Sequence, residues 1–294
     1  MIEKDGMSGQ FKALRPLQVK QSEILQDLDK FCEQYHIAWC LAYGSALGAR
    51  RHGGPIPWDD DVDILMTADS YKQFKKMFIE HGNHEKYYLQ EKVIVKGMVN
   101  DPKIRLNNTT FIEDAVRNMD MHHGIYIDIF ILHNVPQTRL CRMLGRCAGI
   151  YMDLKTLSNQ HYINRRAFIP LMAFLRLFPR DFGMKTALRL EYSFDRKPSN
   201  QMMVWCIGAK PYSKDVLFPF RKMNYDGMPM WVPNNIEKYL EITYGDWKKI
   251  PDMKSILWHQ HAAEWKLDED FRKYAPNVRD FSDEMGSKDM PTEA

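Results

Sequence analysis

Four aspartates open a short segment that then turns apolar, DDDVDILM. In a β-strand, successive side chains point to opposite faces of the sheet. A strand over this segment would therefore place Asp59, Asp61 and Asp63 on one face, while Val62 and Ile64 point into the core from the other. Three carboxylates held this close repel one another unless a cation neutralises them. The segment predicts a buried strand with an acidic cluster on one face and a bound metal ion.

Asp128 has a similar setting, because it is the single charge in the apolar run GIYIDIFIL at 124–132. A lone carboxylate in a buried strand costs several kcal/mol unless it is paired or bound to metal. If its strand lies beside the first, Asp128 completes a metal site with Asp61 and Asp63; pairing with an arginine is the alternative. We expect Mg²⁺ or Mn²⁺, since hard cations take oxygen ligands and keep waters for substrate phosphates. Asp60 faces away in this register and is a weaker candidate.

A Gly-Ser pair follows the buried-type run IAWCLAY at 37–43, which reads as a strand entering a turn. Glycine permits close backbone approach, and a serine at a helix N-terminus can hold a phosphate oxygen together with free amides. Gly44 and Ser45, a D-x-D pair about 16 residues later and a third carboxylate on a strand form the arrangement of nucleotidyltransferases. We therefore expect Gly44 and Ser45 to bind the nucleotide.

The hydrophobic pattern predicts an α+β fold, a nucleotidyltransferase-like mixed sheet flanked by helices. Helices are expected over 17–36, from 46, over 68–82 and, opened by Asn234-Asn235, over 234–243. Strands are expected over 37–43, from 59, and over 87–99, 102–112, 124–132, 202–207 and 216–224.

Four parts follow from this pattern. A catalytic core over 1–136 precedes a mainly helical region over 137–200, residues 201–265 complete the core, and 266–294 form a flexible tail. Residues 138–196 hold 11 Lys and Arg against 4 Asp and Glu, a net charge of +7. Mixed with Phe, Leu and Met, this charge indicates contact with an anionic membrane surface that carries a lipid-linked glycan. An ordinary helical subdomain is the alternative.

Composition limits the remaining classes. A net charge of +3 over 294 residues gives no global basic field, so we expect no nucleic-acid partner. Residues 1–15 lack the apolar core of a signal peptide, and no run approaches the roughly 18 apolar residues of a membrane span. The five cysteines form no C-x-x-C pair and are expected to be small buried hydrophobes in a reducing compartment. These features indicate a cytoplasmic protein, peripheral at the inner face of the membrane.

One long motif, AYGSALGARRHGGPIPWDDDVDIL, resembles the signature of the LicD family, whose relatives include fukutin and the fukutin-related protein. The residues that match the pattern are Gly44, Ser45, Leu47, Gly48, Arg51, His52, Ile56, Pro57, Trp58, Asp59, Asp61 and Asp63. The IDIF sequence around Asp128 resembles the family's later strand, and VPNNIEKYLEITYGDWKKIP at 232–251 resembles its closing motif. The resemblance extends over about 20–250.

The resemblance implies a metal-dependent transferase that moves a phospho-alcohol from a CDP-activated donor to a sugar hydroxyl. Phosphocholine from CDP-choline is the expected group, and ribitol phosphate is that of the fukutin branch. The acceptor would be a surface glycan or a teichoic-acid-like polymer. Carried over to this chain, Asp61 and Asp63 bind metal, Asp128 completes the site and Asp59 assists, with Asp59 or Asp128 as the general base.

Further side chains are candidates for the substrate. Arg51 and His52 lie just before the acidic segment and could contact phosphate, or could form structural salt bridges with it. Arg105 could contact the nucleotide or be an ordinary charge at a strand edge. The pairs His122-His123 and His259-Gln260-His261 lack a third ligand at metal spacing and are expected to be solvated or core histidines.

Three other functions compete. A nucleotidyltransferase proper would use the same aspartates but release pyrophosphate. A D-x-D glycosyltransferase that uses a nucleotide-sugar would lack the Gly-Ser turn and the R-H-x-G-x-I-P-W run. A non-catalytic glycan-binding protein would not need an intact and costly acidic cluster.

Overall fold

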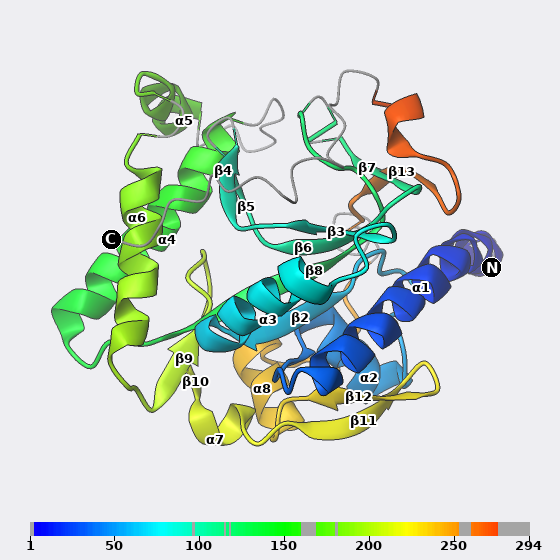
Figure 1. The fold of residues 1–294 in the computed structure, drawn as a ribbon, viewed down its shortest axis with the longest axis horizontal. Helices are drawn as coiled ribbons and strands as arrows, with labels where there is room; N and C mark the ends of the chain where they lie inside the picture. Colours follow the sequence, from blue (N-terminus) through cyan, green and yellow to red (C-terminus); the bar gives the residue numbers. More distant parts are fainter. Residues whose placement is uncertain are drawn as a thin grey trace.

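The computed structural model describes residues 3–95, 98–114, 116–117, 119–159, 169–179, 182–252 and 260–275. Its centre is a curled mixed sheet flanked by helices (Figure 1), so the predicted α+β class is confirmed. The main path of this sheet runs β1 (Cys40–Leu41), β2 (Asp63–Thr67), β8 (Tyr126–Asn134), β6 (Lys103–Leu106), β3 (Tyr87–Gln90). Two more strands extend from the far end of β8, namely β9 (Gln201–Met203) and β10 (Tyr212–Ser213).

Strands β2 and β8 are parallel neighbours at the middle of the sheet, and the other pairings in the sheet are antiparallel. Their register places Asp63 opposite Asp128 and Ile64 opposite Ile129. Both strands are almost wholly buried, which explains why their sequences are runs of apolar residues rather than alternating ones. The prediction that the two acid-bearing strands are adjacent is confirmed.

Helices α1 (Glu3–Gln34) and α3 (Ala68–His81) pack across β2 and β8 on one side of the sheet (Figure 1). The ring of Phe31 on α1 lies 5.8 Å from the rings of both Phe74 and Phe78 on α3, measured between centroids. Thr67 caps α3 by accepting a hydrogen bond from the backbone of Ser70, a favoured N-cap arrangement. The predicted helices over 17–36 and 68–82 are therefore present.

Two further helices meet near the start of β2. Helix α2 (Tyr43–His52) follows β1 directly, and α8 (Ile236–Tyr244) packs against it. Asn235 caps α8 by accepting from the backbone of Lys238, which confirms the predicted helix start.

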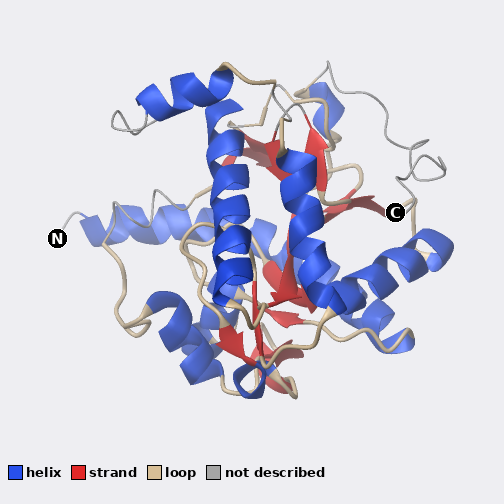
Figure 2. Cartoon of the chain, turned by 90° about the vertical axis from the view of Figure 1, so that its left-hand side faces the viewer, coloured by secondary structure: helices blue, strands red, loops and turns tan. Residues whose placement is uncertain are grey.

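The predicted helical region contains α4 (Arg139–Asn159), α5 (Ile169–Arg176) and α6 (Met184–Ser193), followed by the short η2 (Phe194–Arg196). Helices α5 and α6 both pack on α4, and this group stands in front of the sheet in Figure 2. The limits proposed for the four parts of the chain stay a prediction.

The remaining elements surround the sheet. Three small antiparallel pairs are β4 (Val93–Val95) with β5 (Met98–Asn100), β11 (Arg221–Tyr225) with β12 (Met228–Val232), and β7 (Thr110–Glu113) with β13 (Ala262–Lys266). Short helices are α7 (Lys214–Leu217) and η3 (Phe271–Lys273). Within the described part of the chain, no helix combines the length and apolar character that crossing a membrane requires.

Several predicted boundaries were wrong. The strand expected over 37–43 is two residues long, because the chain already turns into α2 at Tyr43. The strands expected over 87–99 and 102–112 are interrupted, and 216–224 divides between α7 and β11. The expected tail is folded as far as it is described, since Phe271 is buried; residues 276–294 lie outside the described residues. Of the five cysteines, only Cys32 and Cys40 are fully buried.

Candidate active site

The register of β2 and β8 brings three carboxylates together. Asp61, Asp63 and Asp128 each place one ligand oxygen within 4.8 Å of the others. Asp63 is the first residue of β2 and Asp128 lies in the first part of β8, so both acids stand at the same end of the parallel pair. Three carboxylate oxygens at this spacing form the donor set that Mg²⁺ or Mn²⁺ prefers.

Asp59 to Val62 do not belong to the strand, which corrects the prediction that the strand begins at 59. This segment is held instead by buried glutamines on α1. Gln18 donates to the backbone oxygens of Ile56 and Asp59, at 2.9 and 2.8 Å, and Gln21 donates to that of Asp60 at 2.7 Å. The side chains nevertheless alternate between two sides of the chain as predicted, because Asp59, Asp61 and Asp63 all line one cavity.

Gly44 and Ser45 lie in the first turn of α2, directly beside the acids. A Cβ atom on Gly44 would come within 2.6 Å of Asp59 Oδ2, so only glycine leaves room for that carboxylate. The Ser45 hydroxyl is buried and accepts a hydrogen bond from the backbone N–H of Asp63 at 2.9 Å. Ser45 therefore fixes the start of β2, a structural contact that the sequence did not indicate.

Lys103 on β6 is a functional candidate that the sequence reasoning missed. Its ammonium group lies 2.5 Å from Asp128 Oδ1 and 3.7 Å from the centre of the Tyr126 ring. Asp128 thus has a cationic partner, but a lysine rather than the arginine considered as the alternative. The side chain of Lys103 also lines the cavity, where it can reach a substrate phosphate.

Burial and mutual repulsion dominate the electrostatics of the cluster. Burial, followed by the charges of Asp61 and Asp128, raises the pKa of Asp63 well above its usual range. Burial also raises the pKa of Asp61 to about 7, against the attraction of His261. Burial raises the pKa of Asp59 well above normal, with Asp61 adding to the effect. A divalent cation would relieve this repulsion and hold the carboxylates ionised.

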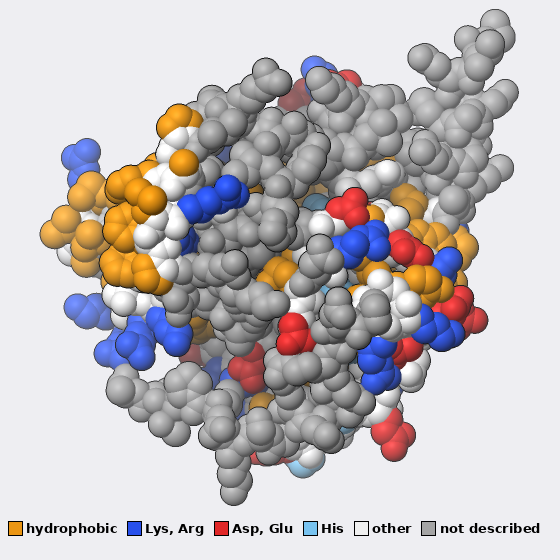
Figure 3. Space-filling view, turned by 90° about the horizontal axis from the view of Figure 1, so that it is seen from above, with side chains coloured by type: hydrophobic (Ala, Val, Ile, Leu, Met, Phe, Trp, Pro, Cys, Tyr) orange, Lys and Arg blue, Asp and Glu red, His pale blue; other side chains and the backbone are white. Residues whose placement is uncertain are grey.

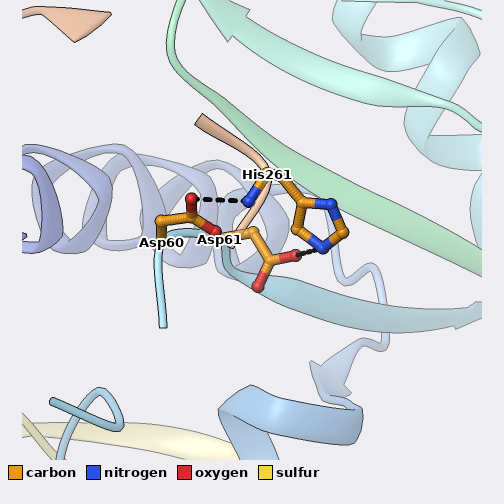
Figure 4. Close-up of side chains that lie close together, drawn as sticks. All are labelled: Asp60, Asp61 and His261. Carbon is orange, nitrogen blue, oxygen red and sulfur yellow. Dashed lines mark hydrogen bonds and ion pairs between the residues drawn. The ribbon is translucent and has the colours of Figure 1, made fainter. Parts of the chain in front are cut away.

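Asp60 is buried and does not line the cavity, in agreement with the alternation. Its Oδ2 accepts hydrogen bonds from the backbone N–H groups of His261 and Ala262, at 2.8 and 2.7 Å. These bonds fasten the start of β13 to the acidic segment, although the residues are about 200 positions apart in sequence. As a result the His261 ring faces Asp61, with Nε2 at 3.5 Å from Oδ2 (Figure 4).

The histidine predictions had different outcomes. His122 and His123 are buried core residues, as expected; His122 stacks on Tyr88 with ring centroids 5.1 Å apart. His261 is exposed, one of the two expected outcomes, and it also lies at the acidic cluster, which the sequence did not indicate. His259 lies outside the described residues.

A cavity of about 830 Å³ opens above the acidic cluster. Its walls come from distant parts of the chain, including Glu113 on β7, the segment 204–212 and the residues after α8. The closing motif supplies Tyr244, Asp246 and Trp247 to this wall, while Tyr239 is buried in the core and accepts from the backbone of Tyr43 at 3.1 Å.

The two residues before the acidic segment are placed differently. Arg51 lines the cavity and donates to the Trp247 backbone oxygen at 3.3 Å, so it is positioned for an anionic substrate. His52 is exposed, accepts from Arg51 at 3.0 Å and packs edge-on against Trp58. The structure therefore brings Arg51, but not His52, to the cavity wall.

Arg105, a candidate for nucleotide contact in the sequence, does not line the cavity. Its side chain is fully buried and donates to Gln90 Oε1 at 2.8 Å and to the Gly124 carbonyl at 3.1 Å. The guanidinium also lies 4.8 Å from the centre of the Tyr126 ring. Its donors are used inside the protein, so it supports the sheet behind the site.

A Gly-Ser pair, a carboxylate cluster at two neighbouring parallel strands and a large cavity are the features that the sequence led us to expect of a nucleotidyltransferase-type site. Residues 36–142 match the family model described as LicD/FKTN/FKRP, nucleotidyltransferase domain. This match agrees with the resemblance to the LicD family seen in the sequence.

One curated relative carries a functional name. The chain is 34% identical over 125 residues to lipopolysaccharide cholinephosphotransferase LicD of Haemophilus influenzae. This match covers 42% of the present chain and 45% of that protein, so the chain matches less than half the length of its relative.

Proposed function

We propose that this protein transfers a phospho-alcohol, phosphocholine in the first instance, from a CDP-activated donor to a sugar hydroxyl of a surface glycan or teichoic-acid-like polymer. The observation that carries the proposal is the cluster of Asp61, Asp63 and Asp128 at the floor of a cavity large enough for a nucleotide and an acceptor. The family domain and the name of the Haemophilus relative support the same reaction type.

Asp61, Asp63 and Asp128 would hold Mg²⁺ or Mn²⁺, and the ion would neutralise the donor phosphates and the leaving CMP. Lys103 and Arg51 add positive charge on the cavity wall for the same phosphates. Asp59 lies on the same cavity wall, close enough to Asp61 to feel its charge, and we assign to it the proton of the attacking hydroxyl. The wall would otherwise act by positioning, since phosphoryl transfer depends mainly on alignment and charge neutralisation.

The cavity also has an aromatic side that suits choline. Tyr43, Phe130, Tyr244 and Trp247 line it together. Aromatic faces attract quaternary ammonium groups through cation–π interactions, which are worth about 1–2 kcal/mol each. A polyol such as ribitol would gain much less from these rings. This lining favours phosphocholine among the phospho-alcohols.

The test is CMP release from CDP-choline in the presence of a glycan acceptor. We expect Asp61→Ala and Asp63→Ala to remain folded by circular dichroism and to lose about a thousandfold in rate, because a bound cation supplies several kcal/mol to such reactions. Asp215→Asn, an exposed acid on α7, is the matched control. Wild-type rates in both cluster variants would refute the proposal.

Nucleotidyl transfer remains the second candidate, because the family model is described as a nucleotidyltransferase domain. It would use the same acids but attack the α-phosphorus of a nucleoside triphosphate. The products separate the two reactions: CMP supports phospho-alcohol transfer, and pyrophosphate supports nucleotidyl transfer.

We further propose that α5 and the residues after it dock on an anionic membrane. Phe174, Leu177 and Phe182 are between 54% and 80% exposed, and the Phe178 ring lies 5.4 Å from Phe174 and 5.3 Å from Phe182. Figure 3 shows apolar side chains gathered on the side of the molecule where α5 lies, with Lys and Arg beside them. Exposed basic side chains of α5 and of the adjoining helices are Arg139, Arg142, Arg146, Arg176, Lys185 and Arg189.

An apolar patch with a basic margin fits the headgroup region of a bilayer that holds anionic lipid. Flotation with phosphatidylglycerol vesicles should recover the protein at low salt. The double variant Phe174→Ser/Leu177→Ser should lose most of this recovery, whereas Val19→Ser, an exposed apolar residue on α1, should not. Equal recovery of all three proteins would contradict this contact.

A further inference from the structure

A second set of ligand atoms lies beside the first and shares one residue with it. Asp60, Asp61 and His261 each offer one ligand atom within 4.8 Å of the others, and Asp61 belongs also to the set with Asp63 and Asp128. Figure 4 shows how the arrangement forms: the backbone of His261 donates to Asp60, and its ring faces Asp61.

Asp60 has a carboxylate oxygen that its surroundings leave unsatisfied. The residue is 1% exposed, and Oδ2 accepts from the backbone N–H groups of His261 and Ala262. Oδ1 is buried and has no hydrogen-bond partner. A buried acceptor without a donor is costly, so such atoms call for a ligand in native proteins.

His261 combines access to solvent with a position at the cluster. Its side chain is 45% exposed, so an ion can reach the ring from the cavity that the ring lines. The separation of 3.5 Å between Nε2 and Asp61 Oδ2 exceeds the roughly 2.9 Å of a typical hydrogen bond, and two ligands of one cation are separated by about this much or more.

We propose that Asp60, Asp61 and His261 form a second cation site, in which Asp61 bridges to the ion held with Asp63 and Asp128. An imidazole ligand favours Mn²⁺ or Zn²⁺ over Mg²⁺, whereas the three-carboxylate site suits Mg²⁺. The pair of sites would therefore differ in ion preference. The catalytic use of the second ion rests on the proposed function, but its binding does not.

Binding is tested on metal-free protein without donor or acceptor. Titration with Mn²⁺, followed by the electron paramagnetic resonance signal of the free ion, should give two ions per chain. His261→Ala should bind one, and Asp61→Asn, which removes the bridging acid, should weaken both sites at least tenfold. His81→Ala, on α3, is the histidine control and should keep two.

A spectroscopic measurement identifies the ligand directly. Electron spin-echo spectra of the Mn²⁺-loaded protein should show ¹⁴N modulation from a coordinated imidazole, and His261→Ala should abolish it. His261 is a partly exposed side chain, so this variant should fold as the wild type does by circular dichroism. One ion per chain in the wild type, or modulation unchanged in His261→Ala, would overturn the proposal.

The outcomes also separate this proposal from the proposed function. Two Mn²⁺ ions with nitrogen modulation but no CMP release would uphold the second site and reject the phosphocholine reaction. CMP release by a protein that binds a single ion would support the phosphocholine reaction and reject the second site.

Discussion

Asp63 and Asp128 stand directly opposite each other in the parallel pairing of β2 and β8. No loop movement is needed to bring them together, because the register of the central sheet already does so. A cation site built on two buried strands is rigid, and its ligands keep their spacing in the free protein.

Mg²⁺ should stabilise the protein against heat and urea. The ion binds the folded state, where Asp61, Asp63 and Asp128 converge, and not the unfolded chain. At a hundred times its dissociation constant this linkage contributes about 2.7 kcal/mol. Differential scanning fluorimetry with chelator or with Mg²⁺ measures the effect. The increase in melting temperature on adding Mg²⁺ should vanish in Asp128→Asn and persist in Asp215→Asn. An equal increase in both variants would mean that the ion binds elsewhere.

Gly44→Ala should lower activity by displacing Asp59, since the new Cβ would lie 2.6 Å from Oδ2. In a helix, replacing glycine by alanine normally stabilises the protein by about 1 kcal/mol. If Gly44→Ala instead lowers the free energy of unfolding, the loss reports the collision between the new Cβ and Asp59. Removing the Asp59 carboxylate should relieve this collision. A double-mutant cycle of Gly44→Ala with Asp59→Ala, measured by urea unfolding, should therefore give a coupling of at least about 1 kcal/mol. Additive effects would exclude direct contact.

Arg105→Lys should reduce stability while leaving the KM for the donor unchanged. The guanidinium donates to both Gln90 and the Gly124 carbonyl, and an ammonium cannot reproduce that geometry. Loss of a buried, charged hydrogen bond costs about 1.5–3 kcal/mol. Urea midpoints and steady-state kinetics on the same preparation test this. A raised KM at unchanged stability would restore Arg105 as a nucleotide-binding residue.

Asp153 on α4 should make stability fall as pH rises. Burial raises its pKa to about 6 in the folded protein, while its carboxylate accepts from the backbone of Ile207 at 2.6 Å. A carboxyl with a raised folded pKa favours folding below the unfolded value near 4, and loses this advantage as pH passes 6. Asp153→Asn keeps an acceptor but no charge.

The variant should therefore gain stability relative to wild type between pH 5 and pH 8, by about 1.4 kcal/mol. Urea unfolding at the two pH values measures the difference. If the difference in free energy of unfolding between Asp153→Asn and wild type does not change with pH, Asp153 titrates normally.

The sequence predicted the centre of the site because the cost of burial restricts where acids can lie. A lone Asp128 in an apolar strand required a partner, and the structure supplies both Lys103 and the neighbouring acids. The alternation of the acidic segment also placed Asp60 correctly. The limits of β2 could not be predicted, because hydrogen bonds from Gln18 and Gln21, on a helix far earlier in the chain, hold the backbone of Asp59 and Asp60.

The surroundings of Arg105 and His261 could not be predicted for a related reason. The spacing of a motif reveals ligands on one element, but not those that arrive from a distant one. His261 reaches Asp61 only through the pairing of β13 with β7 and the two bonds to Asp60. Arg105 lies on β6 beside β8, where internal acceptors satisfy it, and no local pattern distinguishes such an arginine from one that binds substrate.

The two hydrogen bonds between Asp60 and the backbone of His261 and Ala262 also have a consequence for biosynthesis. A ribosome adds about 5–20 residues per second, so on the order of ten seconds or more separate the emergence of the two halves of this contact. During that interval the nascent chain contains the acids of the site but not yet His261 and Ala262, which bond to Asp60. The centre is thus assembled only after residue 262 has emerged from the ribosome.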